Sequence, residues 1–210
     1  MMREGSKKIK IFLGVFLAVY FFVLCNQIAN VPSLYWDELI HVSSAMSFLH
    51  QPYPNYNFMT QTVLGKQLIA VSLFVFGETP SGARFLSAFA SLSCLIFLGL
   101  CCYKLYQSLI LCCFSILLLA FDPLFFLHSK LATLDMYSAL VIGISFYKFL
   151  VIFKKETNKI KSSDFLVLGF LLGLAISIKV HALVLVIPYI FLSSKKISFG
   201  SVLAYFKLFF

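Results

Sequence analysis

Residues 11–36 form a stretch of 26 positions without a single charged side chain, and most of them are apolar. A helix needs roughly 20 consecutive apolar residues to cross the hydrocarbon core of a bilayer. Similar runs recur along the whole chain of 210 residues, of which 61% are hydrophobic and only 12% charged. A soluble domain is usually about half apolar. The sequence therefore predicts an all-α polytopic membrane protein, a helical bundle built as a single transmembrane domain over residues 1–210.

The basic residues fall in short clusters between the apolar runs. The formal net charge is +9, but this spacing is typical of orientation signals on the cytoplasmic side and not of a nucleic-acid-binding patch. We expect a cytoplasmic N-terminus in a bacterial cell membrane or the ER membrane. The expected spans are residues 11–29, 83–103, 105–127, 131–153, 165–178 and 182–192, with a last one beginning near residue 197. The external loop 30–83 then lies outside.

The apolar run inside this loop is too short to cross. Between Lys66 and Glu78 there are only 11 uncharged residues, about 17 Å of helix against a hydrocarbon core of about 30 Å. We interpret it as an amphipathic juxtamembrane helix at the interface. If it crossed, the lysine-rich segment KKETNKIK at residues 154–161 would lie outside, against the positive-inside tendency.

This topology gathers the remaining ionisable groups at the outer face. Charged side chains near lipid are costly and usually have a function. The groups that gather there are Asp37, Glu38, His41, His50, Lys66, Glu78, Arg84, Asp122, His128, Lys130, Asp135, Lys179 and His181. The arrangement predicts an active site at the outer membrane surface.

The acidic pair Asp37–Glu38 follows directly on the first span. Pro32 and Ser33 break that helix, and we expect Asp37 to cap a new one that runs to about residue 49. Asp37, Glu38 and His41 would share one side of its first turn. Asp37 is the candidate base for an incoming hydroxyl, with Glu38 orienting the acceptor or holding a metal. His41 fits a metal ligand or a hydrogen-bond partner, and Asp37 also fits a helix cap alone.

Three cations stand at the outer ends of spans. Arg84, Lys130 and Lys179 are candidates to stabilise a departing phosphate, and Lys66 is a fourth. The structural alternative is that each is a snorkelling anchor. Asp135 is expected to pair with Lys130 or Arg84, since an unpaired charge in a span is expensive. His128 is a candidate donor to phosphate or substrate, or a packed core residue.

Several of these residues lie in segments that resemble, in order, the N-terminal half of the protein O-mannosyltransferase family. This family belongs to the GT-C superfamily, which uses polyprenyl-phosphate sugars and includes the lipid A aminoarabinose transferases. The segments are Asp37-Glu38 with His41, Leu64-Gly65-Lys66, Arg84 to Ala88, Asp122-Pro123 with residues 128–136, and GFLLGLAISIK at residues 169–179. Two positions depart from the pattern. Gln61-Thr62-Val63 stands where the family has His-Pro-Pro, and Lys130 replaces an arginine, which loses bidentate phosphate geometry.

The resemblance implies an inverting glycosyltransferase of GT-C-like fold. It would move a sugar, mannose in this family, from polyprenyl phosphate to a hydroxyl acceptor on protein or glycolipid. It implies catalytic roles for Asp37 and Glu38, assigns no metal ligand and leaves a divalent metal open. Because relatives are longer, we expect a truncated or split enzyme, completed by a second chain. The alternatives are a non-catalytic partner subunit and a small transporter, which would place facing charges in mid-span.

Overall fold

The structure is a computed structural model that describes residues 2–30, 33–51, 62–156 and 159–194. Within these ranges every element is helical and no strand occurs, which confirms the predicted all-α class. The elements in chain order are α1 (Met2–Ala29), α2 (Trp36–His50), α3 (Val63–Phe76), α4 (Pro80–Tyr106), α5 (Leu109–Ala120), α6 (Pro123–Ser129), α7 (Asp135–Phe153), α8 (Ser162–Ile178), the 3₁₀ segment η3 (Val180–Leu185) and α9 (Val186–Ser194).

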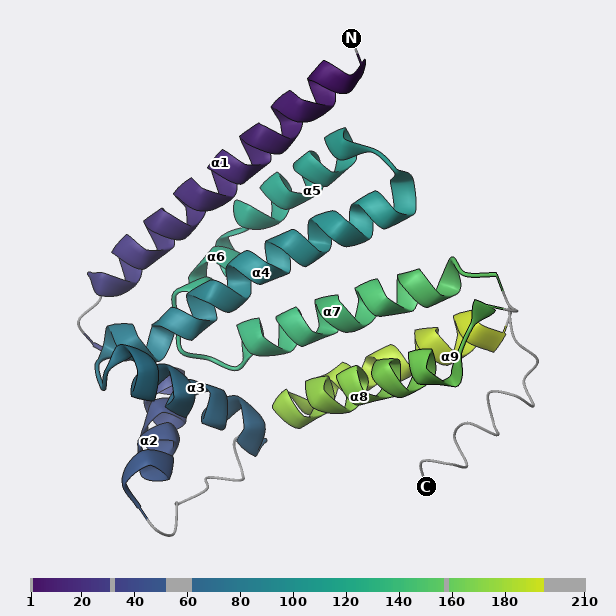
Figure 1. Ribbon diagram of the computed structural model, residues 1–210. Coiled ribbons are helices and arrows are strands. Elements are labelled where there is room, and N and C mark those ends of the chain that lie inside the picture. Colours follow the sequence, from purple (N-terminus) through teal and green to yellow (C-terminus); the bar gives the residue numbers. More distant parts are fainter. Residues whose placement is uncertain (1, 31–32, 52–61, 157–158, 195–210) are drawn as a thin grey trace.

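Within the described ranges, three helices are by themselves long and apolar enough to cross a membrane: residues Lys7–Ala29 of α1, all of α4 and all of α7. Figure 1 shows these three with α5 and α8 as roughly aligned rods, with α4 between α1 and α7. Small side chains line the buried face of α4, among them Ala83, Ser87 and Ser91. Such residues let helix backbones approach closely, which is how membrane helices pack without a hydrophobic driving force between them.

The span expected over residues 105–127 is not one straight helix. α5 ends at Ala120, and α6 follows at an angle of 70°. Asp122 causes this break, because its side chain accepts a hydrogen bond from the backbone N–H of Phe125 (2.7 Å) and so caps α6, with Pro123 at the first helical position. The break turns α6 and the residues after it toward the end of the bundle where α4 begins (Figure 1).

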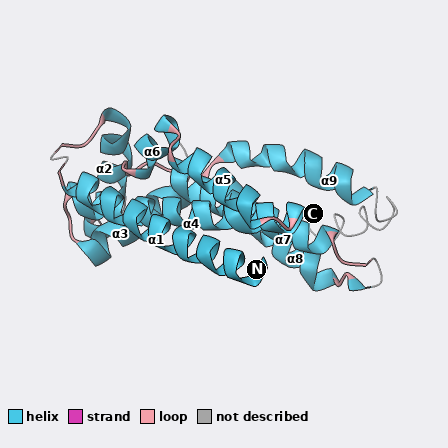
Figure 2. Cartoon of the chain, turned by 90° about the horizontal axis from the view of Figure 1, so that it is seen from above, coloured by secondary structure: helices cyan, strands magenta, loops and turns pink. Residues whose placement is uncertain are grey.

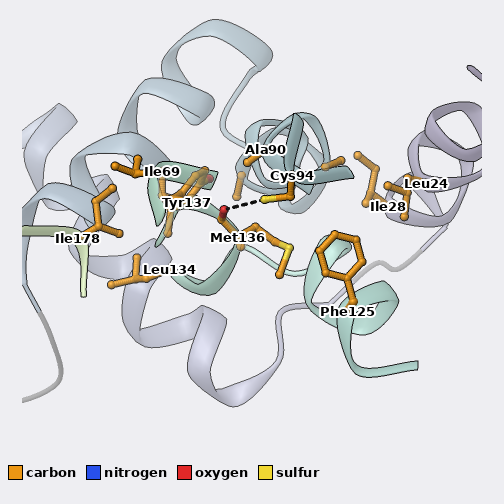
Figure 3. Close-up of a cluster of buried hydrophobic side chains, with 14 of the residues drawn as sticks. Leu24, Ile28, Ile69, Ala90, Cys94, Phe125, Leu134, Met136, Tyr137 and Ile178 are labelled. Carbon is orange, nitrogen blue, oxygen red and sulfur yellow. Dashed lines mark hydrogen bonds between the residues drawn. The ribbon is translucent and has the colours of Figure 1, made fainter. Parts of the chain in front are cut away.

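The apolar core joins helices that are distant in sequence. Figure 3 shows Leu24 of α1, Ile69 of α3, Cys94 of α4 and Phe125 of α6 arranged around the first turn of α7. The Cys94 thiol lies 3.8 Å from the backbone oxygen of Met136, the dashed line in that figure. The start of α7 is therefore fixed from several sides, and it carries site residues.

The helices α2 and α3 lie at one end of the bundle (Figure 1). α3 has 14 residues, about 21 Å of helix, shorter than a typical hydrocarbon core. Its exposed side is also apolar, with Phe74 80% exposed, while Ile69 is fully buried. The view in Figure 2, along a perpendicular direction, places α2 and α3 together at the same end.

Candidate active site

Glu38 and Arg84 form a buried ion pair at the start of α2. The Glu38 carboxylate accepts hydrogen bonds from Arg84 Nε (2.8 Å) and Nη2 (2.7 Å), and both side chains have no exposed surface. Glu38 also accepts from the backbone N–H of Tyr35 (2.9 Å), the residue that precedes the helix. The expectation that Asp37 caps this helix was wrong, since Glu38 satisfies its first backbone donor, as a third-position glutamate does in a capping box.

The same pair reaches two further segments. Glu38 Oε1 accepts from the backbone N–H of Ala132 (2.7 Å), and Arg84 Nη2 donates to the carbonyl oxygen of Ser33 (2.7 Å). A buried ion pair is stable only when its remaining hydrogen-bonding capacity is met in this way. Glu38, expected to face an acceptor or a metal, and Arg84, expected to face phosphate, are instead turned toward each other.

Asp37 points in another direction from its neighbour. One residue along a helix changes the side-chain direction by about 100°, so burying Glu38 leaves Asp37 exposed. No described residue makes a hydrogen bond or an ion pair with the Asp37 carboxylate. It is therefore an acceptor group held on a rigid helix turn and available to a substrate.

His41, one turn further along α2, lies among the charged side chains of the cluster. Its side chain is 5% exposed, and its Nδ1 atom has no hydrogen-bond partner among the described residues. Burial lowers the pKa of His41, and Lys66, itself 1% exposed, lowers it further, while Asp37 and Asp135 act in the opposite sense. The imidazole is therefore neutral near pH 7, with charges on several sides.

Asp135, the first residue of α7, is held by groups from two other segments. Its carboxylate contacts the ammonium group of Lys179, the residue that follows α8, and lies 3.5 Å from Nδ1 of His128. Nδ1 of His128 is also 3.4 Å from the hydroxyl of Thr133. The expected partners of Asp135, Lys130 and Arg84, were wrong. Lys179 takes that place because α8 ends beside the start of α7.

Lys130 stands apart from these pairs. Its ammonium group lies 4.5 Å from the ring centroid of Phe126, a cation–π contact. At the other end of α2, His50 is paired with Glu78 at 2.8 Å, with both side chains partly exposed. No group of three His, Cys, Asp or Glu side chains suited to a metal ion occurs in the described part of the chain.

Two further contacts fix the segments that carry these residues. The Thr62 hydroxyl donates to the carbonyl oxygen of Ile178 (2.5 Å), which joins the start of α3 to the end of α8. The Ser72 hydroxyl donates to the carbonyl oxygen of Gly82 (2.6 Å), which joins α3 to α4.

The predicted gathering of ionisable groups at one end of the bundle is present, although the ion pairs within it differ from the expected ones.

A family model for dolichyl-phosphate-mannose-protein mannosyltransferases matches residues 14–197, which is most of the sequence. The chain belongs to this family. The matched region includes every residue of the cluster, from Asp37 to Lys179. The mannosyltransferase family assignment therefore covers the whole candidate site.

The fold is similar to a solved relative. The crystal structure of ArnT from Cupriavidus metallidurans in the apo state matches with a TM-score of 0.62 and 17% sequence identity, over 84% of this chain and 33% of ArnT. The chain thus spans about a third of the length of that protein, and the likeness shows a shared GT-C-like fold. No curated protein matches the sequence.

Proposed function

We propose that the protein acts in a membrane glycosyltransferase that moves a sugar, mannose, from a polyprenyl-phosphate donor to a hydroxyl acceptor on protein or glycolipid. The observation that carries the proposal is the exposed Asp37 carboxylate, which no described residue pairs with, beside the buried His41 and at the end of the bundle where Lys66 and Lys179 also lie. The family supports the donor class and the sugar.

In the proposed reaction Asp37 is the general base. It accepts the proton of the acceptor hydroxyl as the oxygen attacks the anomeric carbon of the donor. The bond from that carbon to the phosphate oxygen breaks, and the phosphate leaves with the electron pair. Attack on the face opposite the phosphate inverts the anomeric configuration. Glu38 and Arg84 act as positioning residues, because their pair fixes the first turn of α2.

The departing phosphate gains negative charge and needs cations nearby. We assign this role to Lys66, Lys130 and Lys179, in place of Arg84, whose guanidinium is directed to Glu38 and Ser33. The Nδ1 atom of His41, which has no hydrogen-bond partner in the described part of the chain, is assigned to a substrate hydroxyl. His128 and Asp135 hold Lys179 in position.

The transporter alternative has less support. A transport path would place facing charges within the spans, whereas the buried and paired ionisable groups of the site come from helix ends, such as Asp135 at the first residue of α7. We also propose that this end lies outside and that the N-terminus is cytoplasmic. The opposite end supports this orientation, because it holds the pairs of Asp164 with Lys148 and Lys155 in the most lysine-rich part of the chain.

The proposal is tested by a donor panel. Membranes that contain the chain, together with any further segment or second chain that completes the enzyme, are given labelled polyprenyl-phosphate mannose, polyprenyl-phosphate aminoarabinose or a nucleotide-activated mannose. We expect transfer from polyprenyl-phosphate mannose to a hydroxyl acceptor. Transfer from the nucleotide sugar alone would contradict the donor class, and transfer of aminoarabinose alone would contradict the sugar.

A further inference from the structure

A groove of about 350 Å³ lies between α1 and α5. It is lined by Lys8, Ile9, Phe12, Ile110 and Cys113. These residues belong to the start of α1 and the first half of α5, so the groove is at the opposite end of the bundle from α2 and α3 (Figure 1). The proposed transfer reaction does not use it.

The walls of the groove are apolar and belong to the surface that faces lipid. Phe12 is 50% exposed and Ile110 is 69% exposed, and α1 is one of the candidate membrane spans. The volume is at the lower end of the roughly 300–1,000 Å³ that small-ligand pockets occupy. The apolar walls suit a hydrocarbon chain.

One end of the groove carries a positive charge. Lys8 is exposed, as are its neighbours Lys7 and Lys10. A lysine at the membrane surface extends its ammonium group toward the headgroup layer. Basic pockets between membrane helices recognise anionic headgroups in this way.

We propose that the groove is a binding site for an anionic glycerophospholipid of the surrounding bilayer. One acyl chain lies between α1 and α5 along Phe12 and Ile110, and the headgroup phosphate contacts Lys8. The polyprenyl-phosphate donor is not the occupant, because its phosphate is assigned to the other end of the bundle. The bound lipid bridges α1 to α5 at the end where the two helices leave space between them.

The test measures lipid retention and needs no transferase activity. The protein is reconstituted in vesicles of equal parts phosphatidylglycerol and phosphatidylcholine, extracted in mild detergent, and its retained lipids are counted by native mass spectrometry. The variants are Lys8→Gln, the matched control Lys10→Gln, which removes the same charge outside the groove, and Ile110→Trp, which fills it. Because Ile110 is 69% exposed, the larger side chain disturbs no packed core, and circular dichroism verifies the helix content of each variant.

The expected result is that the unaltered protein and Lys10→Gln retain phosphatidylglycerol in preference to phosphatidylcholine. Lys8→Gln should reduce that preference about fivefold, and Ile110→Trp should lose both lipids. Equal losses in Lys8→Gln and Lys10→Gln would show general attraction to a basic segment and overturn the proposal. Retention of phosphatidylglycerol by Ile110→Trp would overturn it too.

Discussion

Glu38 and Arg84 face each other across two hydrogen bonds of 2.8 Å and 2.7 Å, and neither side chain has exposed surface. This pair joins α2 to α4 and, through the backbone of Ala132, to the segment before α7. It also determines which acid faces outward, because burial of Glu38 leaves Asp37 exposed on the adjacent position of the helix. The ion pair thus holds together the segments that form the proposed active site.

Breaking the pair should destabilise the protein strongly. Glu38→Gln leaves the Arg84 charge buried without its counter-ion, a change that costs about 3–5 kcal/mol. The matched control is Glu78→Gln, because the pair of Glu78 with His50 is exposed, and such pairs contribute about 0–1 kcal/mol. Unfolding free energies from denaturant titration in detergent measure both. Similar losses of unfolding free energy in the two variants would contradict a large contribution of the buried Glu38–Arg84 pair to stability.

Replacing both partners should cost less than replacing one. In Glu38→Met/Arg84→Met no buried charge remains unpaired, and similar replacements of buried ion pairs are often neutral or stabilising. The backbone N–H groups of Tyr35 and Ala132 lose their acceptor, so we expect partial recovery relative to Glu38→Gln. The same titration gives the comparison, and a double variant less stable than either single one would argue against mutual neutralisation.

The Asp135–Lys179 contact should tune binding of an anionic donor. Lys179→Met removes a cation and leaves the Asp135 carboxylate uncompensated, so we expect the KM for the lipid-phosphate donor to rise about tenfold, equal to about 1.4 kcal/mol. Adding Asp135→Asn should restore part of the loss. Lys155→Met, which removes a lysine at the other end of the bundle, is the control. If the KM for the donor is unchanged in Lys179→Met, this lysine does not bind the donor phosphate.

His41 should make stability depend on pH. Burial lowers its pKa below the ordinary value of 6.5, so the unfolded chain binds a proton more readily than the folded protein. Stability is then unaffected by this group above pH 6.5 and falls as the pH drops below that value, by up to about 1.4 kcal/mol per pH unit. His41→Gln should flatten the change between pH 7 and pH 5, and His181→Gln, at an exposed position, should not. Parallel curves for His41→Gln and the unaltered protein would refute this role.

The expected orientation has a direct chemical test. Single cysteines at Ser43, exposed on α2, and at Ser163, exposed at the start of α8, lie at the two ends of the bundle. In a background without the native cysteines, an impermeant maleimide added outside intact cells should label Ser43→Cys at once and Ser163→Cys only after permeabilisation. The reverse order would place the proposed site in the cytoplasm.

Much of the fold follows from properties that a sequence displays directly. Long uncharged runs predicted the helices, and the distribution of lysines predicted that the ionisable groups gather at one end. The break at Asp122–Pro123 changed one expected span into two helices, because a capping aspartate with a following proline ends one helix and begins another. The composition of an apolar run predicts how long a helix can be, but not where that helix bends.

The ion pairs inside the site were harder to predict from the sequence than the helices. Whether Asp37 or Glu38 is buried depends on how α2 is rotated about its axis against the other helices, since adjacent side chains on a helix differ in direction by about 100°. Arg84 is 46 residues from Glu38, and nothing in the local pattern names it as the partner. The available signal was the glutamate at the third helical position, but Tyr35 stands where a capping box usually has serine or threonine.

The central claim is that the Asp37 carboxylate takes the proton of the acceptor, and the rate of sugar transfer by Asp37→Asn tests it most directly. The assay uses reconstituted membranes with polyprenyl-phosphate mannose, equal protein abundance, and His50→Gln as a control on the same helix. Loss of a general base predicts a rate lower by about 10²–10⁴-fold, with unfolding free energy unchanged and the control fully active. A rate equal to that of the unaltered protein would contradict the account.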